Sequence, residues 1–162
     1  MRLPHVELVV DTATLAKTPR GTITGAVWLR DGDAYAQADF PEVGWSDSVV
    51  AVLAAWLPEL QRLARTIPAT DANADCHFLD GPYLVTVRVE RPGVWRLRCT
   101  ERRTHGAASE GPEWRTDSGI FLASVTRAAT TVLGFCDTRG WWSTHTEALR
   151  RALEGARASN GH

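Results

Sequence analysis

Two short stretches decide the fold: FPEVGWSD at residues 40–47 and FLDGPY at residues 78–83. The first runs directly into an apolar segment with helical spacing, which is typical of a corner between a strand and a helix. The second combines aspartate, glycine and proline, which is typical of a tight turn between strands. Neither stretch is a catalytic motif. Both therefore indicate an architecture more clearly than a reaction.

A hairpin is predicted before the first of these stretches, around the dipeptide Asp31-Gly32. This dipeptide suits a two-residue turn of the kind in which both residues adopt positive φ. The resulting register pairs Trp28 with Tyr35 and turns both side chains away from the apolar face of the hairpin.

A second hairpin is predicted from the strands at residues 83–90 and 94–100. A two-residue loop at Pro92-Gly93 would mismatch the apolar faces of the strands, whereas a three-residue loop ending at Gly93 aligns them. In that register Arg88 lies directly across from Arg96. The outward face then carries three arginines, namely Arg88, Arg96 and Arg98.

Helices are predicted in three segments where apolar residues recur every three or four positions: from about Asp47 to Ile67, around residues 121–136, and from Thr144 onward. Pro58 lies inside the first segment, where a kink or a restart of the helix is expected. We expect residues 158–162 to form a flexible tail.

The predicted fold class is α+β, because each helix has one apolar stripe and each hairpin has one apolar face. We expect an antiparallel β-sheet of about five to six strands with two to three helices packed on one face, leaving the other face open. The length of 162 residues and a hydrophobic content of 44% are typical of one domain. We place this domain at residues 1–157.

The charge and cysteine content exclude several function classes. The formal net charge is -1, from 18 basic and 19 acidic residues, so no global field attracts nucleic acid or a membrane surface. The N-terminal residues lack the apolar region of a signal peptide, and no uninterrupted apolar run approaches the roughly 18 residues of a membrane span. Three widely spaced cysteines form no disulfide framework. We expect a cytoplasmic protein with no membrane partner.

Catalytic and metal sites find no support in the sequence. Asp47 and Asp80 could pair as general acid and base, but a helix cap and a turn are the ordinary roles of such residues. Cys136 and His145 could form a thiolate and its base, although core packing is commoner for a free cysteine. The five histidines lack metal-ligand spacing, and the motifs of nucleotide and dinucleotide sites are missing. We expect no cofactor and no metal.

The chain resembles a set of small bacterial proteins that includes immunity proteins, which neutralise secreted or contact-delivered toxins. The resemblance rests on Trp45-x-Asp47 before an apolar helix, on the FLDGPY turn, and on Gly140-Trp141 before the last helix. It spans about residues 40 to 150 and implies inhibition by covering a toxin. No catalytic residues come with it.

Two groups of residues are candidates for contact with a partner. Tryptophan, tyrosine and arginine are enriched at binding hot spots, which favours the outward face of the hairpins. A second candidate is the acidic part of the charged stretch at 101–114, which lacks periodicity and is expected to be an irregular loop. The alternative is that further helices cover the aromatic residues and that the charged ones are only solvated. The candidate contact residues are Trp28, Tyr35, Arg88, Arg96, Arg98, Glu110, Glu113 and Trp114.

The sequence therefore predicts a non-enzymatic binding protein, an immunity protein that neutralises a cognate toxin by direct contact. A small nucleic-acid-binding module is the first alternative, with the aromatic residues for stacking and the arginines for phosphates. Its near-neutral charge makes nucleic acid the weaker choice. An enzyme built on Asp47, Asp80 or Cys136 is the second alternative.

Overall fold

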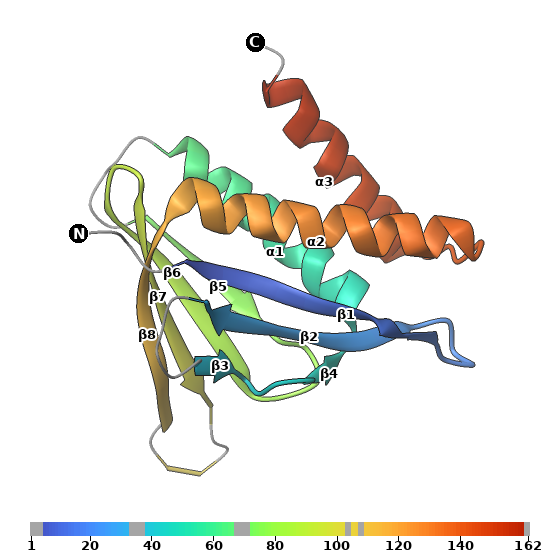
Figure 1. The fold of residues 1–162 in the computed structure, drawn as a ribbon, viewed down its shortest axis with the longest axis horizontal. Coiled ribbons are helices and arrows are strands. Elements are labelled where there is room, and N and C mark those ends of the chain that lie inside the picture. Colours follow the sequence, from blue (N-terminus) through green and yellow to red (C-terminus); the bar gives the residue numbers. More distant parts are fainter. Residues whose placement is uncertain (1–4, 33–37, 67–71, 103–104, 107–108, 161–162) are drawn as a thin grey trace.

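The computed structural model describes residues 5–32, 38–66, 72–102, 105–106 and 109–160. In these residues three helices pack on two antiparallel sheets of four strands each (Figure 1). The α+β class is thus confirmed. The expected single sheet of five to six strands is instead divided in two.

The first sheet is built around one central strand. This strand, β2 (Ile23–Asp31), pairs with β1 (Val6–Lys17) along one edge and with β3 (Ala38–Phe40) and β4 (Ser46–Asp47) along the other. Its residues are almost continuously buried, because both faces of the strand are covered.

The register predicted for the first hairpin is wrong. Asp31 lies opposite Ala38 and not beside a two-residue turn, so the β2–β3 connection is longer than expected. Neither Asp31 nor Gly32 has the positive φ that such a turn requires, and the Gly32 N–H instead bonds to the His5 carbonyl at 3.0 Å. The pairing of β2 with β1 therefore continues past the expected turn.

The second sheet has the order β5-β6-β7-β8, with strands Asn73–His77, Tyr83–Arg91, Val94–Glu101 and Ser109–Asp117. Here the predicted register is confirmed, because Val89 lies opposite Trp95 and Arg88 opposite Arg96. The predicted three-residue loop is wrong: Arg91 pairs with Val94 across Pro92-Gly93, and an irregularity between Val89 and Arg91 keeps the apolar faces aligned. Gly93 has φ +81°. The expectation of an irregular loop over 101–114 is wrong, because much of that stretch belongs to β8.

The helices form two layers above the sheets (Figure 1). Helices α1 (Val49–Arg65) and α2 (Ser118–Thr138) contact the strands, and α3 (Thr144–Asn160) packs on both of them. Helix α1 runs through Pro58 without a break. Helix α3 extends to Asn160, while residues 161–162 lie outside the described part of the chain.

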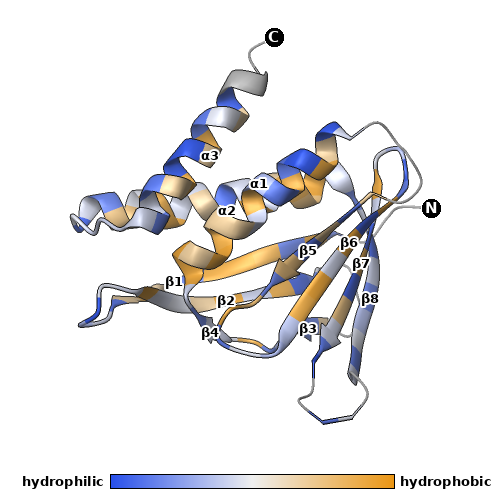
Figure 2. Ribbon diagram, turned by 180° about the vertical axis from the view of Figure 1, so that it is seen from behind, coloured by the Kyte–Doolittle hydropathy of each residue, from blue (hydrophilic) through white to orange (hydrophobic). Residues whose placement is uncertain are grey.

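The core lies between the helices and the inner faces of both sheets. Figure 2 shows apolar colouring concentrated on α1 and β6, whereas α3 is largely hydrophilic. Trp56 on α1 is buried, as its helical spacing predicts. Helix α2 is long and apolar enough on average to cross a membrane. It nevertheless packs as a core helix here, with Phe121, Val125 and Val132 fully buried.

Candidate functional site

The carboxylate of Asp47 joins the two stretches that decide the fold. It is fully buried and accepts hydrogen bonds from the backbone N–H of Leu79 at 3.0 Å and of Asp80 at 3.2 Å. It also accepts bonds from the Ser48 N–H at 2.7 Å and from Trp45 Nε1 at 2.9 Å. Asp47 thus holds the 78–83 turn against the start of α1.

Asp47 does not cap α1, contrary to the structural role preferred from the sequence. Ser48 occupies the N-cap position, and no side chain bonds to the free N–H groups of that helix end. Asp80 lies nearby, with its exposed carboxylate accepting a bond from Ser48 Oγ at 3.2 Å. The two aspartates are therefore close, but the described hydrogen-bond partners of Asp47 are all N–H donors, from the turn, from Ser48 and from the Trp45 indole. This geometry holds a turn in place, and it buries the Asp47 carboxylate away from any substrate.

Aromatic rings from both stretches pack together with Trp56 of α1. We call this cluster the aromatic corner, and it consists of Phe40, Trp45, Trp56, Phe78 and Tyr83. Trp45 and Tyr83 meet edge to face with ring centroids 5.0 Å apart, and Trp56 and Phe78 do the same at 5.0 Å. Phe40 contacts both Phe78 and Tyr83. Edge-to-face pairs of this kind add stability beyond the area they bury.

The corner requires a glycine at its centre. A Cβ on Gly81 would lie 2.7 Å from the ring of Trp45, too close for any other residue without movement. Gly111 on β8 makes a similar approach to the ring of Phe40, at 3.1 Å. Glycines thus let the backbone of the second sheet meet aromatic rings from the first.

The outer face of the second sheet carries the charged residues predicted to contact a partner. By the outer face we mean the exposed side of β6, β7 and β8, opposite Val87, Leu97 and Trp114, which are buried. Its charged side chains are Arg88, Glu90, Arg96, Arg98, Glu110, Glu113 and Arg115. The arginine strip and the acidic candidate, predicted as separate surfaces, lie on this one face.

Arginines and glutamates on this face pair with each other across the strands. Arg96 binds Glu113, Arg98 binds Glu110, and Arg115 binds Glu90. Arg88, Arg96 and Arg115 also stand in one row across three strands. Arg88 lies directly opposite Arg96, and Glu113 of the same chain balances the charge of Arg96.

Unlike the charged residues, the tryptophans predicted to contact a partner are not exposed. Trp28 is buried with only 6% of its surface exposed, and Trp114 is equally buried. Trp28 does lie on the face of β2 opposite Leu29, but its Nε1 donates to Asp39 at 3.1 Å and Arg30 covers its ring. The prediction that Trp28 is open to a partner is therefore wrong. Tyr35 lies outside the described residues.

The cysteines are packed as core residues. Burial raises the pKa of the Cys76 and Cys99 thiols far above the ordinary range, and it also raises that of Cys136. His145 is exposed and lines a hollow whose lining does not include Cys136. The described residues contain no group of three or more side chains able to hold a metal ion.

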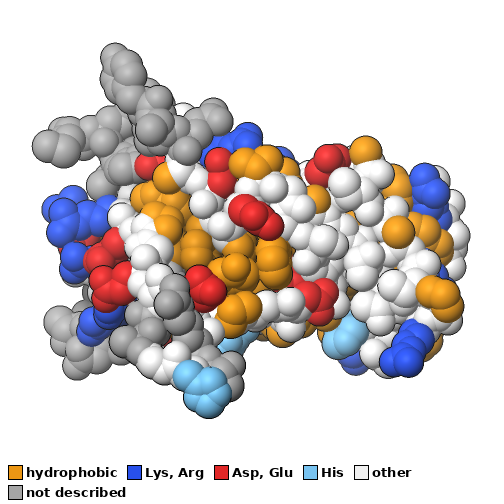
Figure 3. Space-filling view, turned by 90° about the horizontal axis from the view of Figure 1, so that it is seen from below, with side chains coloured by type: hydrophobic (Ala, Val, Ile, Leu, Met, Phe, Trp, Pro, Cys, Tyr) orange, Lys and Arg blue, Asp and Glu red, His pale blue; other side chains and the backbone are white. Residues whose placement is uncertain are grey.

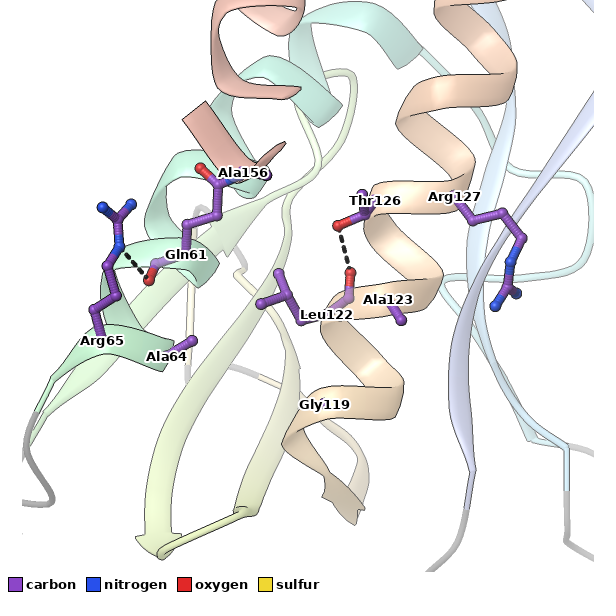
Figure 4. A pocket seen from close by; sticks show the side chains of 9 residues that line it. All are labelled: Gln61, Ala64, Arg65, Gly119, Leu122, Ala123, Thr126, Arg127 and Ala156. Carbon is purple, nitrogen blue, oxygen red and sulfur yellow. Dashed lines mark hydrogen bonds between the residues drawn. The ribbon is translucent and has the colours of Figure 1, made fainter. Parts of the chain in front are cut away.

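A cavity of about 470 Å³ lies between the three helices (Figure 4). Small and apolar side chains line most of it, including Ala64, Leu122 and Ala123. Its charged lining residues are Arg65 and Arg127, whose guanidinium groups point away from the cavity in Figure 4. The described lining thus offers no acid, base or nucleophile.

No family model matches the chain, and neither a curated protein nor a solved structure matches it.

Proposed function

We propose that this chain is a non-enzymatic binding protein of the immunity type, which acts in the bacterial cytoplasm. It neutralises a cognate toxin by direct contact and needs no cofactor. The outer face of the second sheet is the contact surface. The resemblance of the two defining stretches to immunity proteins supplies the kind of partner.

One observation carries this proposal: the exposed residues singled out from the sequence converge on a single face. Arg96, Arg98, Glu110 and Glu113 come from two neighbouring strands and form ordered cross-strand pairs. These side chains are about half exposed, so their charges remain accessible to a partner. A fixed pattern of alternating charges favours one complementary protein surface and rejects others.

A nucleic acid fits this face less well than a protein does. Arg96, Arg98 and Arg115 each pair with a carboxylate, which would repel a phosphate backbone. The bases would also need exposed aromatic rings to stack on, whereas Trp28 and Trp114 are buried.

A charge-swap variant tests the proposal. Replacing Arg96→Glu together with Glu113→Arg keeps the internal ion pair but inverts the charges that a partner meets. The matched control is Arg150→Asp with Asp137→Arg, which inverts an exposed pair between α2 and α3.

The assay has two steps. The tagged chain first isolates a stoichiometric protein partner from the native host, and growth is then measured when partner and chain are expressed together. We expect the wild type and the control to restore growth and the Arg96–Glu113 swap to fail. Restored growth with the swap rejects this face, and salt-dependent binding to single-stranded oligonucleotides without a protein partner rejects the immunity function.

A further inference from the structure

The underside of the aromatic corner is a second candidate surface. Figure 3 shows apolar atoms gathered there with acidic side chains around them. Val43 is 61% exposed, and Pro41, Trp45 and Tyr83 are half-buried. We call these four residues the aromatic patch. An apolar centre with a charged rim is the usual anatomy of a protein interface.

Two exposed carboxylates lie next to this patch in the described part of the chain. Glu42 lies within the turn that carries Val43, and Asp80 precedes Gly81, which contacts the ring of Trp45. Both carboxylates are exposed, and neither forms an ion pair with another described residue. Among the described arginines, Arg102 bonds into the patch region through its backbone N–H, which donates to the carbonyl of Pro82. Arg98, further along the sheet, is held by Glu110.

Asp47 adds a negative charge beneath the patch. Its two oxygens accept hydrogen bonds only from N–H groups among the described residues, which is the pattern of an ionised carboxylate. No described cation pairs with it. Because a buried charge is poorly screened by water, its field extends to the ring of Trp45, which donates to it directly.

We propose that the aromatic patch receives an arginine or lysine side chain of a basic protein segment. A cation placed against Trp45 gains a cation–π contact and the attraction of Asp47, Asp80 and Glu42 together. The same carboxylates repel the phosphates of a nucleic acid or a membrane surface. The inference rests on the proposed function only in taking the partner to be a protein.

A titration with a defined probe tests this surface without knowledge of the partner. The full-length, ¹⁵N-labelled chain is titrated with the acetylated pentapeptide Gly-Arg-Gly-Arg-Gly, and its amide and indole N–H signals are followed by NMR. The matched probe replaces both arginines with glutamate. We expect saturable shifts centred on the Trp45 indole N–H and on the amides of Gly81 and Tyr83, with the arginine peptide alone.

Two variants then test whether the negative charges of Glu42 and Asp80 contribute to peptide binding. The double variant Glu42→Gln with Asp80→Asn should lower the affinity for the arginine peptide about 3- to 10-fold, which is the loss expected for two exposed charge contacts. Glu154→Gln, an exposed change on α3, should leave affinity unchanged. A preserved amide spectrum shows that each variant is folded.

Three results would overturn the inference: equal shifts with the glutamate peptide, shifts centred on β7 and β8, or unchanged affinity in the double variant. None of them bears on growth rescue by the charge-swap variant. Failure of this inference and failure of the proposed function are therefore distinguishable.

Discussion

The side chain of Asp47 accepts the backbone N–H of Asp80 at 3.2 Å across 33 positions of the chain. This contact brings together the two stretches of sequence that decide the fold. It also explains why a carboxylate can be fully buried here, since each of its oxygens accepts bonds from N–H donors that the turn would otherwise leave unpaired.

Asp47→Asn tests the role of this buried carboxylate. The amide nitrogen cannot accept a hydrogen bond, so at least one of the N–H donors around the side chain, Trp45 Nε1 or a backbone N–H, loses its partner. We expect a loss of about 1–3 kcal/mol in the free energy of unfolding, measured by urea denaturation. Asp80→Asn, at an exposed carboxylate, is the control and should change stability little. Equal stabilities of the two variants would contradict the role assigned to Asp47.

Gly81→Ala tests the close packing of the aromatic corner. The added Cβ would stand 2.7 Å from the ring of Trp45, so a loss of about 1–3 kcal/mol is expected from overpacking. Gly134→Ala is the matched control, because Gly134 lies inside α2 and, beyond its chain neighbours and the helix's own backbone, no atom lies within 4 Å of the added Cβ. It should stabilise the protein by about 0.5–1 kcal/mol through helix propensity. Changes of opposite sign in the melting temperatures of the two variants would support the close packing of the aromatic corner. An unchanged melting temperature for Gly81→Ala would argue against it.

Trp28→Ala distinguishes the buried position of Trp28 in the structure from the outward position expected from the sequence. An outward Trp28 would cost little to remove, whereas the buried ring bound to Asp39 should cost about 3–5 kcal/mol. The midpoint of urea unfolding measures the difference. A midpoint shift close to zero would indicate that the Trp28 side chain is exposed, as expected from the sequence.

The buried thiols predict how stability depends on pH. Burial raises the pKa of Cys76, with smaller contributions from Glu59 and Asp75. In the unfolded chain the same thiol ionises near its ordinary pKa of about 8.5. The stability is therefore fully present below about pH 8.5 and falls as the pH rises toward the folded-state pKa, by up to about 1.4 kcal/mol per pH unit.

Cys76→Ala should make this alkaline slope shallower. The slope is read from urea unfolding at several values between about pH 9 and about pH 10, where the unfolded thiol is ionised. Comparing slopes removes the constant cost of the cavity that the substitution leaves. Identical slopes in the variant and the wild type would mean that Cys76 ionises as readily in the folded protein as in the unfolded one.

The second hairpin was predictable because its register is set locally. Alternating valines fix its apolar face, and Gly93 supplies the positive φ that its turn needs. The first hairpin was not predictable from Asp31-Gly32, because pairing with the distant strand β1 outweighs the local preference for a turn. Strand β8 escaped detection because Gly111 and Pro112 interrupt its alternation at a shift in register.

The candidate surface was predictable in its residues but not in its arrangement. The outward placement of Arg88, Arg96 and Arg98 follows from the register of their own hairpin. The position of Glu110 and Glu113 beside them depends on β8, which no local pattern predicted. The contact between residues 40–47 and 78–83 could not be predicted either. It depends on the Asp47 side chain in the first sheet, which bonds to the turn between β5 and β6 of the second sheet.

The most direct test of the central claim is the affinity of the partner for a variant in which two ion pairs of the outer face are reversed. The variant combines Arg96→Glu, Glu113→Arg, Arg98→Glu and Glu110→Arg, which keeps both internal pairs and inverts the charge pattern of the outer face. Isothermal titration calorimetry with the isolated partner should show binding weaker by about 100-fold, roughly 3 kcal/mol, at an unchanged melting temperature. A dissociation constant equal to that of the wild type, in a variant that melts normally, would contradict the claim that this face binds the partner.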